Sequence, residues 1–237
     1  MDFGPMIHAI LFDFNGVIID DEPLQMKAYQ AVFGEVGMTL TEADYYGSLG
    51  MDDVTFVRAA FQRAGRDLDD ATLAGVLERK TAEHRELISA ELPLFPGVVT
   101  FVKACARAYT LGVVSMARRD DIAYVLERAG LAQAFSVIVS AEDVTACKPD
   151  PACYRRAFEL LSERRRPAGA QPFAPAGCLV IEDAPPGVQS ARAAGMKTLG
   201  VTNTVTEQAL RAAGANVVTR SLADWTPDAV YHVFGER

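Results

Sequence analysis

The feature of this sequence that most constrains its fold is a repeated alternation of short apolar runs with amphipathic segments. The runs lack a strict apolar–polar alternation, which is typical of strands buried on both faces of a parallel sheet. They occupy residues 7–13, 109–115, 135–140, 178–183, 198–202 and 216–219. Between them, apolar residues recur at helical spacing, as in Ile122, Val125, Leu126 and Ala129. Strands that alternate with helices favour right-handed crossovers and therefore predict a Rossmann-like, doubly wound α/β sheet.

One long segment interrupts this alternation. Residues 21–92 carry helical patterns only. A block of this length is too long for a single crossover connection. We therefore expect an all-helical cap domain at 21–92, inserted into an α/β core domain formed by 1–20 and 93–237. A shorter interruption, residues 162–176, is rich in Pro, Ala and Arg and predicts a surface loop.

The charge balance narrows the range of partners. The formal net charge of −8 argues against general affinity for nucleic acid or for anionic membranes. No apolar run approaches the roughly 20 residues that a membrane-spanning helix needs, and the first residues lack the basic region of a signal peptide. The four cysteines form no CxxC pair, which is typical of reduced thiols. We expect a cytoplasmic protein that is a monomer or a weak homo-oligomer.

Side chains capable of chemistry stand where the apolar runs end. Asp13, Ser115 and the Glu182-Asp183 pair close three of the runs, and Lys148 follows shortly after another. Because the carboxyl ends of parallel strands meet at one edge of a sheet, we expect these groups to converge there. Each alone would be costly to bury. Together they offer a carboxylate nucleophile, a hydroxyl donor, a cation and a pair of metal-binding acids.

Four segments, in this order, resemble the four motifs of the haloacid dehalogenase superfamily. ILFDFNGVIIDDEP at residues 10–23 resembles the first motif, and GVVSMARR at 112–119 resembles the second. CKPDP at 147–151 resembles the third, and LVIEDAPPGVQSARAAGM at 179–196 resembles the fourth. The helical segment also stands where the subfamily that includes β-phosphoglucomutase and phosphoglycolate phosphatase carries its cap. This resemblance implies a Mg²⁺-dependent enzyme acting on a small phosphorylated metabolite.

The resemblance also implies a role for individual residues. Asp13 would attack phosphorus and form a mixed anhydride, while Lys148 would neutralise both the nucleophile and the phosphate. Ser115 and the amide of Met116 would bind the phosphate. Arg118 and Arg119 lie one turn beyond Ser115, and either could reach the substrate anion. Arg119 is the one we assign to phosphate binding, and a solvated helix face is an equally good interpretation.

Mg²⁺ prefers hard oxygen ligands and retains several waters. The resemblance assigns as its ligands Asp13, Asp183 and the main-chain carbonyl of Asn15, with Glu182 binding directly or through water. The alternative is that Glu182 and Asp183 only cap the helix that follows them. Both roles are compatible.

The largest departure from the family pattern is Asn15. Phosphatases of the family usually have a second aspartate here, which protonates the leaving group and later activates water. An amide does not exchange protons near neutral pH, so we expect an impaired acid–base step unless a nearby acid replaces it. Asp20, Asp21 and Glu22 follow closely, but a solvated loop is the favoured interpretation for them. His84 is interpreted as a surface residue.

The favoured function is hydrolysis of a small organic phosphate monoester through an aspartyl phosphate. A phosphosugar mutase would share that intermediate and is a near alternative. Asn15 supports a second alternative, a catalytically impaired phosphate-binding or regulatory protein. A metal-free dehalogenase is a third, and the Glu182-Asp183 pair argues against it.

Overall fold

The computed structural model describes residues 6–164 and 174–235. Within them, six parallel strands form one sheet in the order β3-β2-β1-β4-β5-β6. They are β1 (Ala9–Phe12), β2 (Thr110–Val114), β3 (Val137–Val139), β4 (Cys178–Glu182), β5 (Lys197–Val201) and β6 (Val217–Thr219). The chain winds outward from β1 in one direction and from β4 in the other. The predicted doubly wound α/β fold is confirmed, and its switch point lies between β1 and β4.

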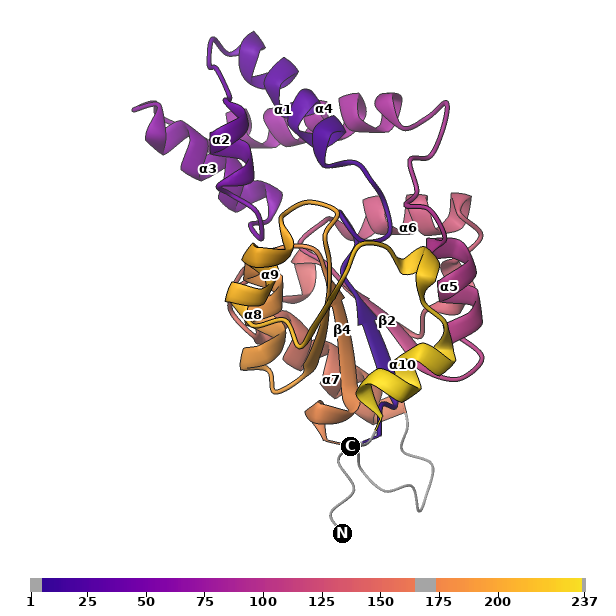
Figure 1. Ribbon diagram of the computed structural model, residues 1–237. Coiled ribbons are helices and arrows are strands. Elements are labelled where there is room, and N and C mark those ends of the chain that lie inside the picture. The colour runs from indigo at the N-terminus through magenta and orange to yellow at the C-terminus, as the bar shows by residue number, and fades with distance from the viewer. Residues whose placement is uncertain (1–5, 165–173, 236–237) are drawn as a thin grey trace.

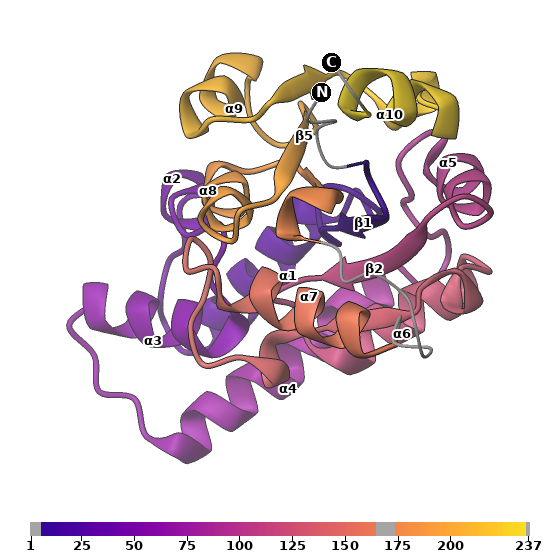
Figure 2. The same cartoon turned by 90° about the horizontal axis from the view of Figure 1, so that it is seen from below.

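Both faces of the sheet are covered by helices, as the absence of alternation in the strands predicts. On one face lie α5 (Val98–Cys105), α6 (Arg119–Arg128) and α10 (Pro227–Phe234). On the other lie α7 (Ala152–Arg164), α8 (Pro185–Ala193) and α9 (Glu207–Ala213). Figure 2 shows the two helical layers on either side of the strands. Short 3₁₀ helices at Ala132–Ala134, Ala141–Asp143, Pro175–Gly177 and Leu222–Asp224 complete the connections.

Strand β1 shows how the core fixes the site. Its side chains point alternately to the two faces, so that Ile10 and Phe12 join one apolar cluster while Ala9 and Leu11 join the other. Phe12 is fully buried, and its ring meets the ring of Phe101 at a centroid distance of 6.1 Å. Burying one such side chain contributes about 1.5–3 kcal/mol. The residue before Asp13 is therefore held rigidly.

The long interruption in the sequence forms four helices over the carboxyl ends of the strands (Figure 1). They are α1 (Glu22–Glu35), α2 (Glu42–Tyr46), α3 (Asp53–Arg63) and α4 (Asp70–Leu87). They have a separate aromatic core in which Tyr29, Phe33 and Phe56 pack together. We refer to these four helices as the cap. The exact division into 1–20, 21–92 and 93–237 stays a prediction.

Two further expectations can be compared with the described residues. Residues 162–164 of the segment predicted as a loop belong to α7, which continues to Arg164. Residues 165–173, which include Arg165 and Arg166, lie outside the described residues. In the part of the chain that is described, no helix has both the length and the apolar character needed to cross a membrane.

Candidate active site

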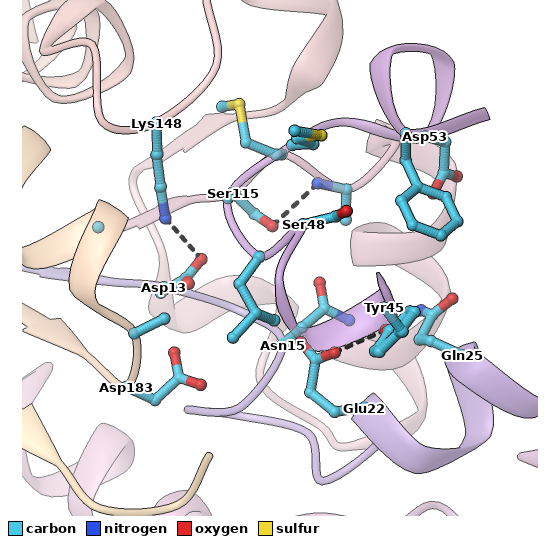
Figure 3. A pocket seen from close by; sticks show the side chains of 18 of the residues that line it. Asp13, Asn15, Glu22, Gln25, Tyr45, Ser48, Asp53, Ser115, Lys148 and Asp183 are labelled. Atoms are coloured by element: carbon cyan, nitrogen blue, oxygen red, sulfur yellow. Dashed lines mark hydrogen bonds and ion pairs between the residues drawn. The ribbon is translucent and has the colours of Figure 1, made fainter. Parts of the chain in front are cut away.

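A cavity of about 110 Å³, partly open to solvent, lies between the carboxyl ends of the strands and the cap. Core residues that line it include Asp13, Asn15, Ser115, Met116, Arg118, Lys148, Glu182 and Asp183. Cap residues that line it include Glu22, Gln25, Tyr29, Tyr45, Ser48, Asp53 and Lys80. Figure 3 shows the labelled side chains of both groups around one space. The groups that the sequence places at the strand ends are thus brought together here.

Lys148 bridges two carboxylates at the base of this cavity. Its Nζ lies 3.0 Å from Asp13 Oδ1 and 2.6 Å from Glu182 Oε1. Tyr154 also donates to Glu182 Oε1, at 2.7 Å. Burial alone would lower the pKa of Lys148, but the charges of Asp13 and Glu182 outweigh it and raise that pKa above its ordinary value. The lysine therefore stays charged beside the proposed nucleophile.

The carboxylates around Lys148 carry more negative charge than one ammonium can offset. Burial, followed by the charge of Glu182, raises the pKa of Asp13 to about 7, even though Lys148 and the Phe14 amide oppose this. Burial, followed by Glu182 and Asp13, raises the pKa of Asp183 well above its usual range. Such shifts mark a place where a positive charge would be stabilising.

The same three acids have the arrangement that a metal site requires. Asp13, Glu182 and Asp183 each offer a ligand oxygen, and these oxygens lie within 4.8 Å of one another. An all-oxygen donor set with excess negative charge fits Mg²⁺. The residues present are therefore suited to the cation that the sequence predicts.

Two glycines allow the backbone to approach these acids closely. A Cβ atom at Gly16 would lie 1.9 Å from Asp183 Oδ2, and Gly16 has a φ of +74°. A Cβ atom at Gly187 would lie 1.8 Å from Glu182 Oε1. Any side chain at either position would displace an acid, so both glycines belong to the site. We did not single out either glycine from the sequence, although each lies in a motif that carries an acid.

The loop after β2 contains Ser115 and Met116, which the sequence predicts to bind the phosphate and which both line the cavity. Ser115 is buried, and its Oγ accepts a hydrogen bond from the amide of Ala117 at 3.0 Å. The arginine in this loop that faces the cavity is Arg118. Arg119, which the sequence nominates for the substrate anion, instead places its guanidinium against Asp143 and its amide against Glu142. Arg119 thus contacts those acids, and of the two arginines that the sequence offers, Arg118 is the one that lines the cavity.

Asn15 belongs to a polar network around the buried Asp21, which could not be predicted from the residues that flank Asn15 in the sequence. Its Nδ2 donates to both carboxylate oxygens of Asp21, at 2.9 and 3.0 Å. Gln25 Nε2 donates to Asp21 Oδ2 at 3.0 Å. His84 Nε2, from α4, lies 2.8 Å from Asp21 Oδ2 without hydrogen-bond alignment. Asp21 is completely buried and His84 is 4% exposed, so the solvated-loop and surface interpretations of these two residues are wrong. Asp20 is exposed, as expected.

This network predicts that Asn15→Asp destabilises the protein. The substitution sets a second carboxylate against the buried Asp21 and removes a donor from it. Losing one partner of a buried polar group costs about 1–3 kcal/mol, and more when the group is charged. Urea unfolding at neutral pH measures the loss.

The double variant Asn15→Asp/Asp21→Asn is the matched control for this prediction. It exchanges the two side chains and keeps one amide and one carboxylate in contact, so most of the lost stability should return. An Asn15→Asp variant as stable as the parent would show that the contact between Asn15 and Asp21 is not formed in solution.

Most of the chain also matches a known protein family. The family profile described as haloacid dehalogenase-like hydrolase matches residues 10–201. Fructose-1-phosphate phosphatase YqaB of Escherichia coli is 30% identical over 193 residues, which are 81% of this chain and 95% of that protein. Protein SUPPRESSOR OF QUENCHING 1, chloroplastic, of Arabidopsis thaliana is 31% identical over 224 residues. They are 92% of this chain, which spans only 20% of that much longer relative.

The fold is also found among solved structures. β-Phosphoglucomutase from Clostridium difficile superposes with a TM-score of 0.83 at 20% identity, over 97% of each chain. At this identity the likeness shows the fold alone. The profile match, together with the acids, lysine and serine gathered at the strand ends, shows that the chain belongs to the haloacid dehalogenase-like hydrolase family.

Proposed function

We propose that the protein hydrolyses a phosphate monoester of a small carbohydrate through a phosphoaspartate at Asp13. The observation that carries this proposal is the position of Asp13, which directly follows a buried strand, lines the cavity and lies 3.0 Å from Lys148 Nζ. The relative YqaB, named as a fructose-1-phosphate phosphatase, supports the class of substrate. The mutase alternative shares the same intermediate and differs only in the product.

In this proposal, each residue has a task set by its position. A carboxylate oxygen of Asp13 forms a bond to phosphorus as the bond from phosphorus to the ester oxygen breaks. Lys148 offsets the charge that Asp13 and the phosphate bring together. Ser115 and the amide of Met116 hold the phosphate oxygens, and Arg118 attracts the anion to the cavity.

Mg²⁺, held by Asp13, Asp183, Glu182 and the main-chain carbonyl of Asn15, would supply further positive charge at the phosphate. The raised pKa values of Asp13 and Asp183 support this assignment, because they reflect acids that lack enough positive partners. Glu182 has two tasks in this scheme, since it also fixes Lys148 and Tyr154.

The cap supplies the wall opposite the phosphate. Asp53 accepts hydrogen bonds from Lys80 at 3.0 Å and from Tyr29 at 2.5 Å, so its charge is largely balanced. Ser48 and Gln25 add neutral polar groups to this wall. A wall of hydroxyl, amide and paired charged groups suits a substrate rich in hydroxyls.

The proposed function predicts that chelation of Mg²⁺ abolishes phosphate release. Phosphate release from a panel of hexose and hexitol phosphates should fall by at least about 10²-fold in excess EDTA, because a bound metal supplies several kcal/mol of charge stabilisation. Asp183→Asn should show a similar loss even with Mg²⁺ added. The matched control is Glu159→Gln, which removes one exposed acid on α7. Full activity in EDTA would contradict the metal assignment.

Stabilisation by inorganic phosphate without turnover of any substrate would favour the impaired phosphate-binding protein instead.

A further inference from the structure

We propose that Glu22 is the general acid and general base of the reaction, a task that the amide of Asn15 cannot perform. This inference rests on the proposed phosphatase function and deepens it. Glu22 is the first residue of α1, where the chain passes from the core into the cap. Its side chain lines the cavity that Asp13 and Asn15 also line (Figure 3).

The other acids near the cavity are less suited to proton transfer than Glu22, because each already has a donor or a cation as a partner. Asp21 does not line the cavity, and both of its oxygens are engaged by donors. Asp53 is paired with Lys80, and Asp121 is paired with Arg85. Each of these two acids is thus already engaged by a cation.

Glu22 has a different kind of partner. Its Oε2 accepts a hydrogen bond from the hydroxyl of Tyr45, at 2.6 Å. A hydroxyl is neutral, so this contact persists whether or not the other oxygen carries a proton. Tyr45 therefore fixes the position of the carboxyl group and leaves Oε1 available for proton transfer.

The surroundings of Glu22 also favour proton exchange near neutrality. Burial is the largest cause that raises its pKa, to about 7, followed by the charge of Asp21. The hydrogen bond from Tyr45 and the charge of Lys80 oppose this, while Asp13 adds to it. The titratable groups that face Glu22 from the packed elements are Asp21, Tyr45, Tyr46, Lys80, Asp13 and Asp183. Burial and the charge of Asp21 are thus the two largest causes that raise the pKa of Glu22.

The proton balance of the two steps follows. As Asp13 forms its bond to phosphorus, the bond to the ester oxygen breaks, and protonated Glu22 gives its proton to that leaving oxygen. In the second step, ionised Glu22 takes a proton from water. The water oxygen bonds to phosphorus, the anhydride bond to Asp13 breaks, and inorganic phosphate leaves. Asp13 is again a carboxylate, and Glu22 again carries its proton.

Glu22→Gln is the test, because it keeps the shape of the side chain and an acceptor for Tyr45. With fructose 1-phosphate, whose leaving oxygen needs a proton, kcat should fall by about 10²–10⁴-fold. With p-nitrophenyl phosphate, whose leaving group needs none, a burst of nitrophenol should remain, followed by a slow steady state. The phosphoenzyme should then accumulate.

The pH profile separates proton transfer from simple substrate binding. In the parent, the steady-state rate on p-nitrophenyl phosphate should rise with pH through about 7, as Glu22 becomes able to act as a base. Glu22→Gln should lose this rise, while its burst should keep the pH dependence that the burst has in the parent. Tyr45→Phe should keep the rise but move it to higher pH, because it removes a hydrogen bond that lowers the pKa of Glu22 in the parent.

Rescue provides a second, independent readout. Adding Asn15→Asp/Asp21→Asn to Glu22→Gln places a carboxylate at position 15, and fructose 1-phosphate turnover should recover. A higher KM with unchanged kcat and unchanged pH profile in Glu22→Gln would overturn the acid–base role and leave the phosphatase proposal standing. A parent that neither turns over these substrates nor forms a phosphoenzyme would overturn both.

Discussion

Asp13→Asn is expected to abolish phosphoryl transfer while leaving the fold intact. The variant keeps the shape and the hydrogen bond from the Phe14 amide, but its amide cannot attack phosphorus. Removal of a catalytic nucleophile costs on the order of 10⁶ in kcat in well-studied hydrolases. We expect a loss of similar size with fructose 1-phosphate and with p-nitrophenyl phosphate.

The Asp13→Asn variant should nevertheless be at least as stable as the parent. Asp13 is crowded by Glu182 and Asp183, and its raised pKa shows that the ionised form is disfavoured. The contact between Lys148 and Glu182, at 2.6 Å, does not involve Asp13 and should persist in the variant. The Tm without added metal should therefore equal or exceed that of the parent. Asp20→Asn, at an exposed acid nearby, should change neither activity nor Tm. Turnover by a pure preparation of Asp13→Asn would show that the nucleophile is another residue.

Lys148→Met should destabilise the protein more strongly than either Asn15→Asp or Asp13→Asn. The variant leaves Glu182, which is 0% exposed, without its ammonium partner and beside Asp13. Removing one member of a buried ion pair costs about 3–5 kcal/mol, because the remaining charge stays uncompensated. Catalysis should also be lost, since the charge that offsets the attack of Asp13 is gone.

Urea unfolding checks this prediction, and two variants frame it. Lys103→Met removes an exposed lysine and should be close to neutral. Lys148→Met/Glu182→Gln removes both charges of the pair and should recover part of the stability, because no ionised Glu182 then remains buried. A Lys148→Met variant as stable as the parent would contradict the buried ion pair.

The sequence predicts the core side of the site well because that side depends on local pattern. A run such as 9–12 has to be buried on both faces, and the residue after it then appears at the edge of a parallel sheet. Asp13, Ser115 and Asp183 are placed by this rule alone. This rule does not predict whether Arg118 or Arg119 faces the cavity, because the two residues are adjacent at the start of α6 and their side chains point in different directions.

The cap side of the site depends on contacts between distant segments. Because its neighbours in the sequence are charged, Asp21 is predicted to lie in a solvated loop. In the structure, His84 of α4 contacts Asp21, and both residues are buried. Glu22 becomes a cavity residue because α2 places Tyr45 beside it. Helical periodicity predicts that such helices exist but not which faces of them meet. The partners of the acids, and hence their protonation, could not be predicted from local pattern.

The measurement that tests the central proposal most directly is mass spectrometry of acid-quenched protein after brief reaction with p-nitrophenyl phosphate and Mg²⁺. We expect one added phosphoryl group on the parent, located by peptide mapping at Asp13, larger in amount in Glu22→Gln and absent from Asp13→Asn. Steady turnover by the parent with no adduct in any variant, or an adduct on a residue other than Asp13, would contradict the proposal.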